Sequence, residues 1–339
     1  MKKVLFLGLL SLLTLSIFAA SGDKPKKHLG IATYSVKGLE SDIEGSLKSL
    51  ADAGYVTVEI SNYNAQNGTV AGYKPADYAA LAAKFGLKII SSHARAKFDV
   101  KDVPGTVAAW SKIFDDHKVM GCKYVVFPMN MWSGNFDVLK QECELMNQIG
   151  EAANERGIKF GYHNHHMEFA TIAGTDQMYE DYLIANTDPS KVFFQMDVYW
   201  VTQGGQNPVA YLKKYPDRFR VLHIKDDYVI GESGKIDYKA IFKQFYKNGH
   251  EDWFVEIEDK QTPEQREQSK AMMDGMKEMQ AKGGTMEDFF KEMMKNRPKG
   301  QPMPGFGPQD PAVVAQKLKD SLEAIKLSGQ YLGSAKFVK

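Results

Sequence analysis

The sequence predicts an α/β fold in the form of an eight-stranded (β/α)8 barrel, and three observations favour it. Apolar runs alternate with helical segments along the chain, which is the pattern of a parallel sheet. The length of 339 residues lies within the range of one such barrel. Metal-capable side chains occur where several apolar runs end, and a barrel places its active site at the carboxyl ends of its strands.

The elements follow from apolar periodicity and from glycines that end helices. Strands are predicted at 28–36, 57–61, 87–93, 123–129, within 159–169, and at 192–198, 220–225 and 253–257. Helices are predicted at 42–53, 75–85, 107–120, 136–156, 176–186, 208–215, 238–248 and 311–327. An open doubly wound sheet is the alternative, but the turn at 34–40 holds one glycine, where that fold usually has a glycine-rich phosphate turn.

The N-terminus predicts export. Lys2 and Lys3 precede an apolar run at 4–19, which small residues follow, so residues 1–20 have the pattern of a cleaved signal peptide. A buried N-terminal helix is the alternative. The run is too short for a membrane anchor, because a bilayer needs roughly 20 apolar residues. The expected location is therefore periplasmic or secreted, with 26–339 as a single barrel domain.

Composition excludes several classes of protein. Charged residues make up 25% and hydrophobic residues 43% of the chain, which indicates a globular domain. The net charge of +1 gives no reason to expect a nucleic acid partner or a membrane surface. Cys122 and Cys143 fit either a disulfide or two buried thiols.

A segment of about fifty residues, 260–310, separates the last strand from the last helix. Polar helices are predicted at 263–281 and 286–295, and the first carries Met272, Met273, Met276 and Met279 at helical spacing. The methionines fit the packed face of an insert. Because the insert leaves the carboxyl end of the barrel, it is also a candidate lid or a contact between copies in a homo-oligomer.

The segment 159–169 concentrates metal-capable residues. It holds three of the eight histidines, His163, His165 and His166, together with Glu168. Side chains of a strand alternate between its faces, so His163 and His165 are expected to project the same way. Imidazole and carboxylate groups at this spacing suit a divalent metal.

Three later strands end in further metal-capable residues, Asp197, His223 and Glu256. Each alone also fits a buried, hydrogen-bonded residue or a solvated strand end. Together at a barrel mouth they favour a metal, since a cation removes the cost of burying unpaired carboxylates. We expect Glu168, Asp197, His223 and Glu256 to hold one divalent ion.

The motifs resemble a known family. The segments 162–169, 196–197, 222–226, 231–237 and 255–258 are similar to those of sugar phosphate isomerases/epimerases, which are xylose isomerase-like TIM barrels of the AP endonuclease 2-type superfamily. The resemblance covers essentially the whole mature chain and implies a divalent ion, manganese first, with zinc, cobalt or magnesium as alternatives. It assigns Asp197, His223 and Glu256 as ligands directly. The family has a glutamate where this chain has His163, so Glu168 is expected to reach the metal, with His163 as the alternative ligand.

Such a site supports proton abstraction beside a carbonyl through a metal-stabilised enediolate. His163 or His165 is the expected acid/base, and Lys225 is expected to stabilise charge. Residues near the mouth that are expected to bind a small carbohydrate are Tyr34, Glu59, His93 and Trp200. Reprotonation of the enediolate gives a sugar isomerase or epimerase.

Loss of a leaving group instead gives a lyase, and some relatives are similar to enzymes that act on 3-keto-glycosides. A 3-keto-glycoside lyase or hydratase is therefore the alternative activity. A non-catalytic sugar-binding barrel would keep the aromatic residues without needing the metal ligands. A metal-dependent endonuclease would need a basic DNA-binding face, which the net charge of +1 does not supply.

Overall fold

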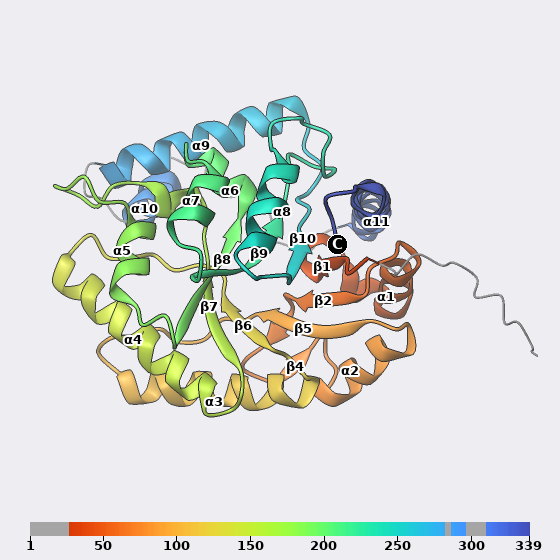
Figure 1. Ribbon diagram of the computed structural model, residues 1–339, viewed down its shortest axis with the longest axis horizontal. Coiled ribbons are helices and arrows are strands. Elements are labelled where there is room, and N and C mark those ends of the chain that lie inside the picture. Colours follow the sequence, from red (N-terminus) through yellow and green to blue (C-terminus); the bar gives the residue numbers. More distant parts are fainter. Residues whose placement is uncertain (1–26, 282–285, 296–309) are drawn as a thin grey trace, which may run out of the picture.

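The computed structural model describes residues 27–281, 286–295 and 310–339. Its centre is a closed parallel barrel, which confirms the predicted fold class (Figure 1). The strands are β1 Gly30–Ala32, β2 Thr57–Ile60, β5 Lys88–His93, β6 Tyr124–Phe127, β7 Lys159–His163, β8 Val192–Asp197, β9 Phe219–Ile224 and β10 Trp253–Val255. The barrel closes where β1 pairs with β10, with Ile31 opposite Val255.

Helices surround the barrel (Figure 1). They are α1 Ile43–Asp52, α2 Pro75–Lys84, α3 Val103–Met120, α4 Phe136–Asn154, α5 Tyr179–Asn186, α6 Val198–Gln203, α7 Pro208–Lys214, α8 Tyr238–Lys247, α9 Pro263–Ala281, α10 Met286–Lys295 and α11 Pro311–Ser334. Short 3-10 turns lie at Thr33–Ser35, Leu39–Ser41 and His166–Phe169, and a small hairpin joins β3 Tyr63–Asn64 to β4 Thr69–Val70.

Some element boundaries differ from the sequence prediction for local reasons. The first strand is three residues long, because a 3-10 turn begins at Thr33. Helix α3 begins earlier than predicted, since the Asp102 side chain accepts a hydrogen bond from Gly105 N and caps it. Helix α6 was not predicted. It begins directly after β8 because Asp197 caps it through Tyr199 N and Trp200 N.

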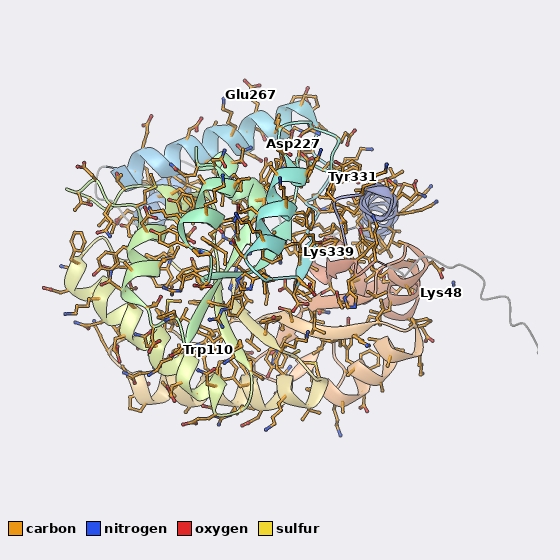
Figure 2. All side chains as sticks on the ribbon, viewed as in Figure 1. Lys48, Trp110, Asp227, Glu267, Tyr331 and Lys339 are labelled. Atoms are coloured by element: carbon orange, nitrogen blue, oxygen red, sulfur yellow. The ribbon has the colours of Figure 1, made fainter. Side chains whose placement is uncertain are left out.

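Apolar side chains fill the barrel beneath its carboxyl end. Because side chains alternate along a strand, Phe193 lies on the same face of β8 as Gln195 and Asp197. Gly161 of β7 makes room for the Phe193 ring, since a Cβ at that position would lie 2.5 Å from it. A second apolar layer packs the helices on the strands, where Trp110 of α3 lies 5.2 Å from Phe160 between ring centres (Figure 2).

The segment between β10 and α11 contains α9 and α10, and residues 282–285 and 296–309 lie outside the described structure. The expected signal peptide, 1–20, also lies outside the described residues. None of the helices in the described ranges is long and apolar enough to cross a membrane. Cys122 and Cys143 are both buried and free.

Candidate functional site

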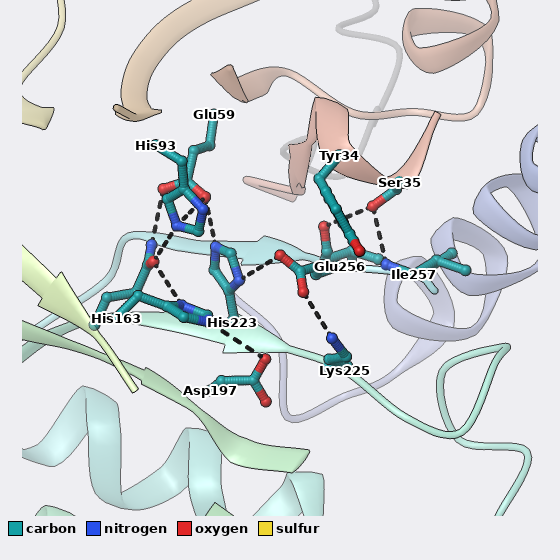
Figure 3. Close-up of polar contacts among 12 residues, drawn as sticks. Tyr34, Ser35, Glu59, His93, His163, Asp197, His223, Lys225, Glu256 and Ile257 are labelled. Atoms are coloured by element: carbon teal, nitrogen blue, oxygen red, sulfur yellow. Dashed lines mark hydrogen bonds and ion pairs between the residues drawn. The ribbon is translucent and has the colours of Figure 1, made fainter. Parts of the chain in front are cut away.

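The site is built on a buried carboxylate, Glu59 of β2. Its Oε2 accepts hydrogen bonds from Ser91 Oγ at 2.7 Å and Gln195 Nε2 at 2.8 Å. Its Oε1 lies 2.5 Å from His223 Nε2 and 3.2 Å from His93 Nε2 (Figure 3). Burial opposes ionisation of Glu59, but the neighbouring His93 and His223 and the hydrogen bonds lower its pKa to about 2. Glu59 is therefore an ionised acceptor beneath the histidines.

Gln195 fixes the orientation of His163. Because the Gln195 amide nitrogen donates to Glu59, its Oε1 must be the atom that faces the histidines. This oxygen lies 2.7 Å from His93 Nε2 and 3.0 Å from His163 Nδ1, so both nitrogens donate to it. The remaining nitrogen of His163, Nε2, then keeps its lone pair and faces Asp197 Oδ2 at 4.0 Å.

A hydrogen bond also fixes the orientation of His223. Its Nε2 is directed at Glu59, so Nδ1 faces Glu256 Oε2 at 3.1 Å. Asp197 uses Oδ1 to cap α6, and its Oδ2 is buried without a hydrogen-bond partner among the described residues. Figure 3 shows these side chains meeting from β7, β8, β9 and the residue after β10.

These contacts define a candidate metal centre. Two groups of residues have ligand atoms within 4.8 Å of one another, Asp197–His223–Glu256 and His93–His163–His223. The donor set fits a divalent ion, since imidazole nitrogens and carboxylate oxygens are its usual protein ligands. Burial raises the pKa of Asp197 to about 7, with Glu256 adding to the shift and Lys225 and His223 opposing it. A cation would relieve this cost.

Lys225, directly after β9, adds a positive charge to the site. Its buried ammonium donates to Glu256 Oε1 at 2.8 Å and Glu258 Oε1 at 2.5 Å. Burial alone would lower the pKa of Lys225, but Glu256 and Glu258 raise it well above its usual value. Lys225 is therefore a fixed cation beside the candidate metal centre. Tyr34 donates to the other oxygen of Glu258 at 2.9 Å.

Glu168, expected as a metal ligand, lies elsewhere. Its Oε1 accepts from Tyr162 Oη at 2.6 Å, and its Oε2 accepts from the backbone nitrogen of His165 at 2.7 Å. It belongs to neither candidate metal group. The 3-10 turn at His166–Phe169 turns its carboxylate away from the barrel axis and into this capping interaction. Glu168 thus positions the segment that carries His165, and His163 occupies the strand position expected for a ligand.

Two cavities open on the site. The first, with a volume of about 320 Å³, is lined by Tyr34, His93, His163, His165 and Glu256 among others. The second, of about 530 Å³, is lined by His165, Trp200 and residues of α9. Met129, His165 and Glu258 line both cavities. Glu59, expected to contact substrate, is fully buried and lines neither cavity, so it acts through His93 and His223 instead.

Sequence reasoning missed Gln195 and the role of Glu258. Gln195 lies two residues before Asp197 on β8, so strand alternation places it on the inward face with Asp197. The signal in the sequence that could have identified Gln195 was an amide side chain within an otherwise apolar strand. Glu258 was not among the expected site residues, but Lys225, Tyr34 and Lys37 all approach its carboxylate.

This arrangement is a parallel α/β barrel whose carboxyl end holds imidazoles and carboxylates around a buried lysine, with a candidate metal centre among them. The sequence model of the xylose isomerase-like TIM barrel family matches residues 47–279. The chain therefore belongs to the xylose isomerase-like TIM barrel family.

Solved and curated relatives agree with this assignment. A sugar phosphate isomerase/epimerase from Parabacteroides distasonis is similar at a TM-score of 0.71 and 29% identity, covering 95% of this chain and 98% of that one. An inosose dehydratase from Geobacillus thermodenitrificans is 26% identical over 67% of this chain and 85% of its own length. An inosose dehydratase from Clostridium beijerinckii is 30% identical over 35% of this chain, and the match spans 46% of that protein.

Proposed function

We propose that this protein is a divalent-metal-dependent enzyme that removes the proton next to the carbonyl of a small carbohydrate and acts as a sugar isomerase or epimerase. One observation carries the proposal. Asp197, His223 and Glu256 hold ligand atoms within 4.8 Å of one another, and His163 Nε2 lies 4.0 Å from Asp197 Oδ2, beside the 320 Å³ cavity that His163 and Glu256 line. Hydrogen bonds to Gln195 and Glu59 hold the two histidines in the orientation that a ligand requires.

We assign His163, Asp197, His223 and Glu256 as the metal ligands. Manganese is our first choice, and zinc and cobalt also suit two imidazoles with two carboxylates, whereas magnesium prefers oxygen ligands alone. When bound, such an ion would polarise the carbonyl and stabilise negative charge that develops beside it.

Side chains of the protein carry out the proton transfer and stabilise the charge that results. His165 lines both cavities. Its backbone is held by Glu168. We assign His165 as the group that accepts the substrate proton and Lys225 as the cation that stabilises the resulting charge. Tyr34 and His93, which line the first cavity, contact the sugar.

A lyase is the second candidate function. If a substituent on the carbon beyond the deprotonated one leaves before reprotonation, the same first step ends in elimination. The likeness to inosose dehydratases, whose name denotes removal of water, supports this outcome. A 3-keto-glycoside would lose its aglycone by the same route, and the second cavity offers room beside the first.

Exchange of the substrate proton with solvent tests the proposed function. Manganese-loaded protein is incubated in D₂O with an inosose, a free ketose and a 3-keto-glucoside, and proton NMR follows exchange and products. We expect exchange next to the carbonyl with at least one of these compounds, and we expect His165→Asn to slow it by about 100-fold or more while metal content is retained. Loss of metal from His165→Asn would contradict its assignment as an acid/base group outside the ligand set.

We further propose export, on the N-terminal pattern of Lys2, Lys3 and the apolar run 4–19. Expression of the full chain in a Gram-negative host, followed by mass measurement of the periplasmic protein, tests this. Loss of about twenty N-terminal residues is expected, and an uncleaved cytoplasmic chain would contradict it.

A further inference from the structure

We infer that the second cavity is a subsite for an apolar, aromatic portion of the substrate, so that the substrate has two parts and one part binds under α9. This inference rests on the proposed function, because it takes the first cavity as the place of the reacting sugar.

The two cavities are neighbours that share part of their walls. Met129, His165 and Glu258 line both the 320 Å³ and the 530 Å³ cavity. A molecule that places its reacting carbon beside His165 can therefore extend past that side chain into the second space. Both volumes lie in the usual range for small-molecule pockets. The second cavity is the larger, so a free monosaccharide would leave most of the joined space unfilled.

The lining of the second cavity indicates the chemistry of its occupant. Aromatic and thioether side chains form one part of it, from Met167, Tyr199, Trp200, Met272, Met273 and Met276, and polar or charged side chains such as Gln203, Asp226, Arg266 and Lys270 form the rest. Thioethers adapt their shape and make favourable contacts with aromatic rings. Burial of a flat apolar group against them removes apolar surface from water on both sides.

Trp200 adds a polar feature to this wall. Its ring centre lies 5.0 Å from that of Tyr199 and 4.8 Å from the Lys225 ammonium. Its Nε1 is buried and has no hydrogen-bond partner in the part of the chain that the structure describes. A buried donor without an acceptor is costly.

Helix α9 forms the outer wall. Met276 is buried, whereas Met272 is 45% exposed and lies at the rim. Figure 2 shows Glu267 pointing outward from α9 and Asp227 lying beneath the helix. Met272, Met273 and Met276 therefore lie on the face of α9 that lines the second cavity. We propose that this face contacts the aromatic group.

The experiment measures binding without reaction. Phenyl β-D-glucoside and methyl β-D-glucoside carry the same sugar and lack a carbonyl next to which a proton could be removed. Dissociation constants for both are measured by titration calorimetry with manganese-supplemented protein. We expect the phenyl glucoside to bind about tenfold more tightly or better, from the additional apolar surface that it buries.

Two variants test whether the second cavity is the source of the tighter binding of the phenyl glucoside. Met273→Glu and Met272→Glu place a charge in the wall and at the exposed rim of the second cavity, and both should reduce the phenyl preference by about fivefold or more. Met294→Glu on α10, where Met294 is 50% exposed and outside the cavity lining, is the matched control and should preserve the preference. Equal affinity for the two glucosides, or equal effects of Met272→Glu and Met294→Glu, would overturn the inference.

Failure of the subsite can be distinguished from failure of the proposed function. A phenyl preference that depends on Met272 and Met273, in a protein without proton exchange, would support the subsite and contradict the enzymatic proposal. Proton exchange with a ketose, together with equal binding of both glucosides, would contradict the subsite alone.

Discussion

Glu59 Oε1 lies 2.5 Å from His223 Nε2, joining β2 to β9 across the interior of the barrel. Neither side chain is exposed to solvent. The contact determines which nitrogen of His223 faces the candidate metal centre, because the nitrogen that donates to Glu59 cannot also bind a metal. Glu59 is thus a positioning residue that holds a ligand without touching the ion.

Substitution of Glu59 by glutamine should weaken metal binding. The neutral amide loses the charge-assisted contact with His223, and we expect a 10- to 100-fold fall in metal affinity, the usual effect of removing such a partner. Competition with a chromogenic chelator measures it. Glu142→Gln, at a buried glutamate of α4 outside the site, is the control. Equal affinities in both variants would contradict the role of Glu59.

Replacement of Lys225 by methionine should slow proton abstraction. The ammonium beside Glu256 and Glu258 is the fixed positive charge nearest the ligands, and its loss should reduce turnover by about 100-fold or more. The NMR exchange assay measures this. Lys37→Met is the matched control, since Lys37 approaches Glu258 at 3.9 Å and lines neither cavity of the site. Similar losses in both variants would indicate a general effect on Glu258 instead.

Glu142 should make stability depend on pH. Burial raises its pKa to about 7 from 4.5, although Ser133 N donates to its carboxylate. The folded chain therefore holds this proton more tightly than the unfolded chain does. Its stabilising contribution is fully present below about pH 4.5 and is lost as the pH rises through about 7.

Glu142→Gln is neutral at every pH and should remove this contribution. Urea unfolding of both proteins between pH 5 and 8 measures the difference in their unfolding free energies. As the pH rises, we expect the unfolding free energy of the variant to increase relative to that of the wild type, by an amount on the order of 3 kcal/mol at most. A difference that stays constant across this range would show that Glu142 is not neutral in the folded protein.

The sequence was sufficient for the barrel and for much of the site. Asp197, His223 and Glu256 could be placed because parallel strands bring their carboxyl ends together. Glu168 could not, since its direction depends on a 3-10 turn and on the hydroxyl of Tyr162. The contribution of Gln195 depends on a bond to Glu59, 136 residues away, and such long-range pairing leaves no local pattern in the sequence.

Metal content tests the central claim most directly. The purified mature chain, Glu256→Gln and Glu258→Gln are loaded with manganese, dialysed and analysed by plasma mass spectrometry. Glu258 is the matched control because it also binds Lys225 but belongs to neither candidate metal group. We predict about one ion per chain in the wild type and in Glu258→Gln, with strong loss in Glu256→Gln. Wild-type protein that retains no manganese, zinc or cobalt, or equal metal in all three proteins, would contradict it.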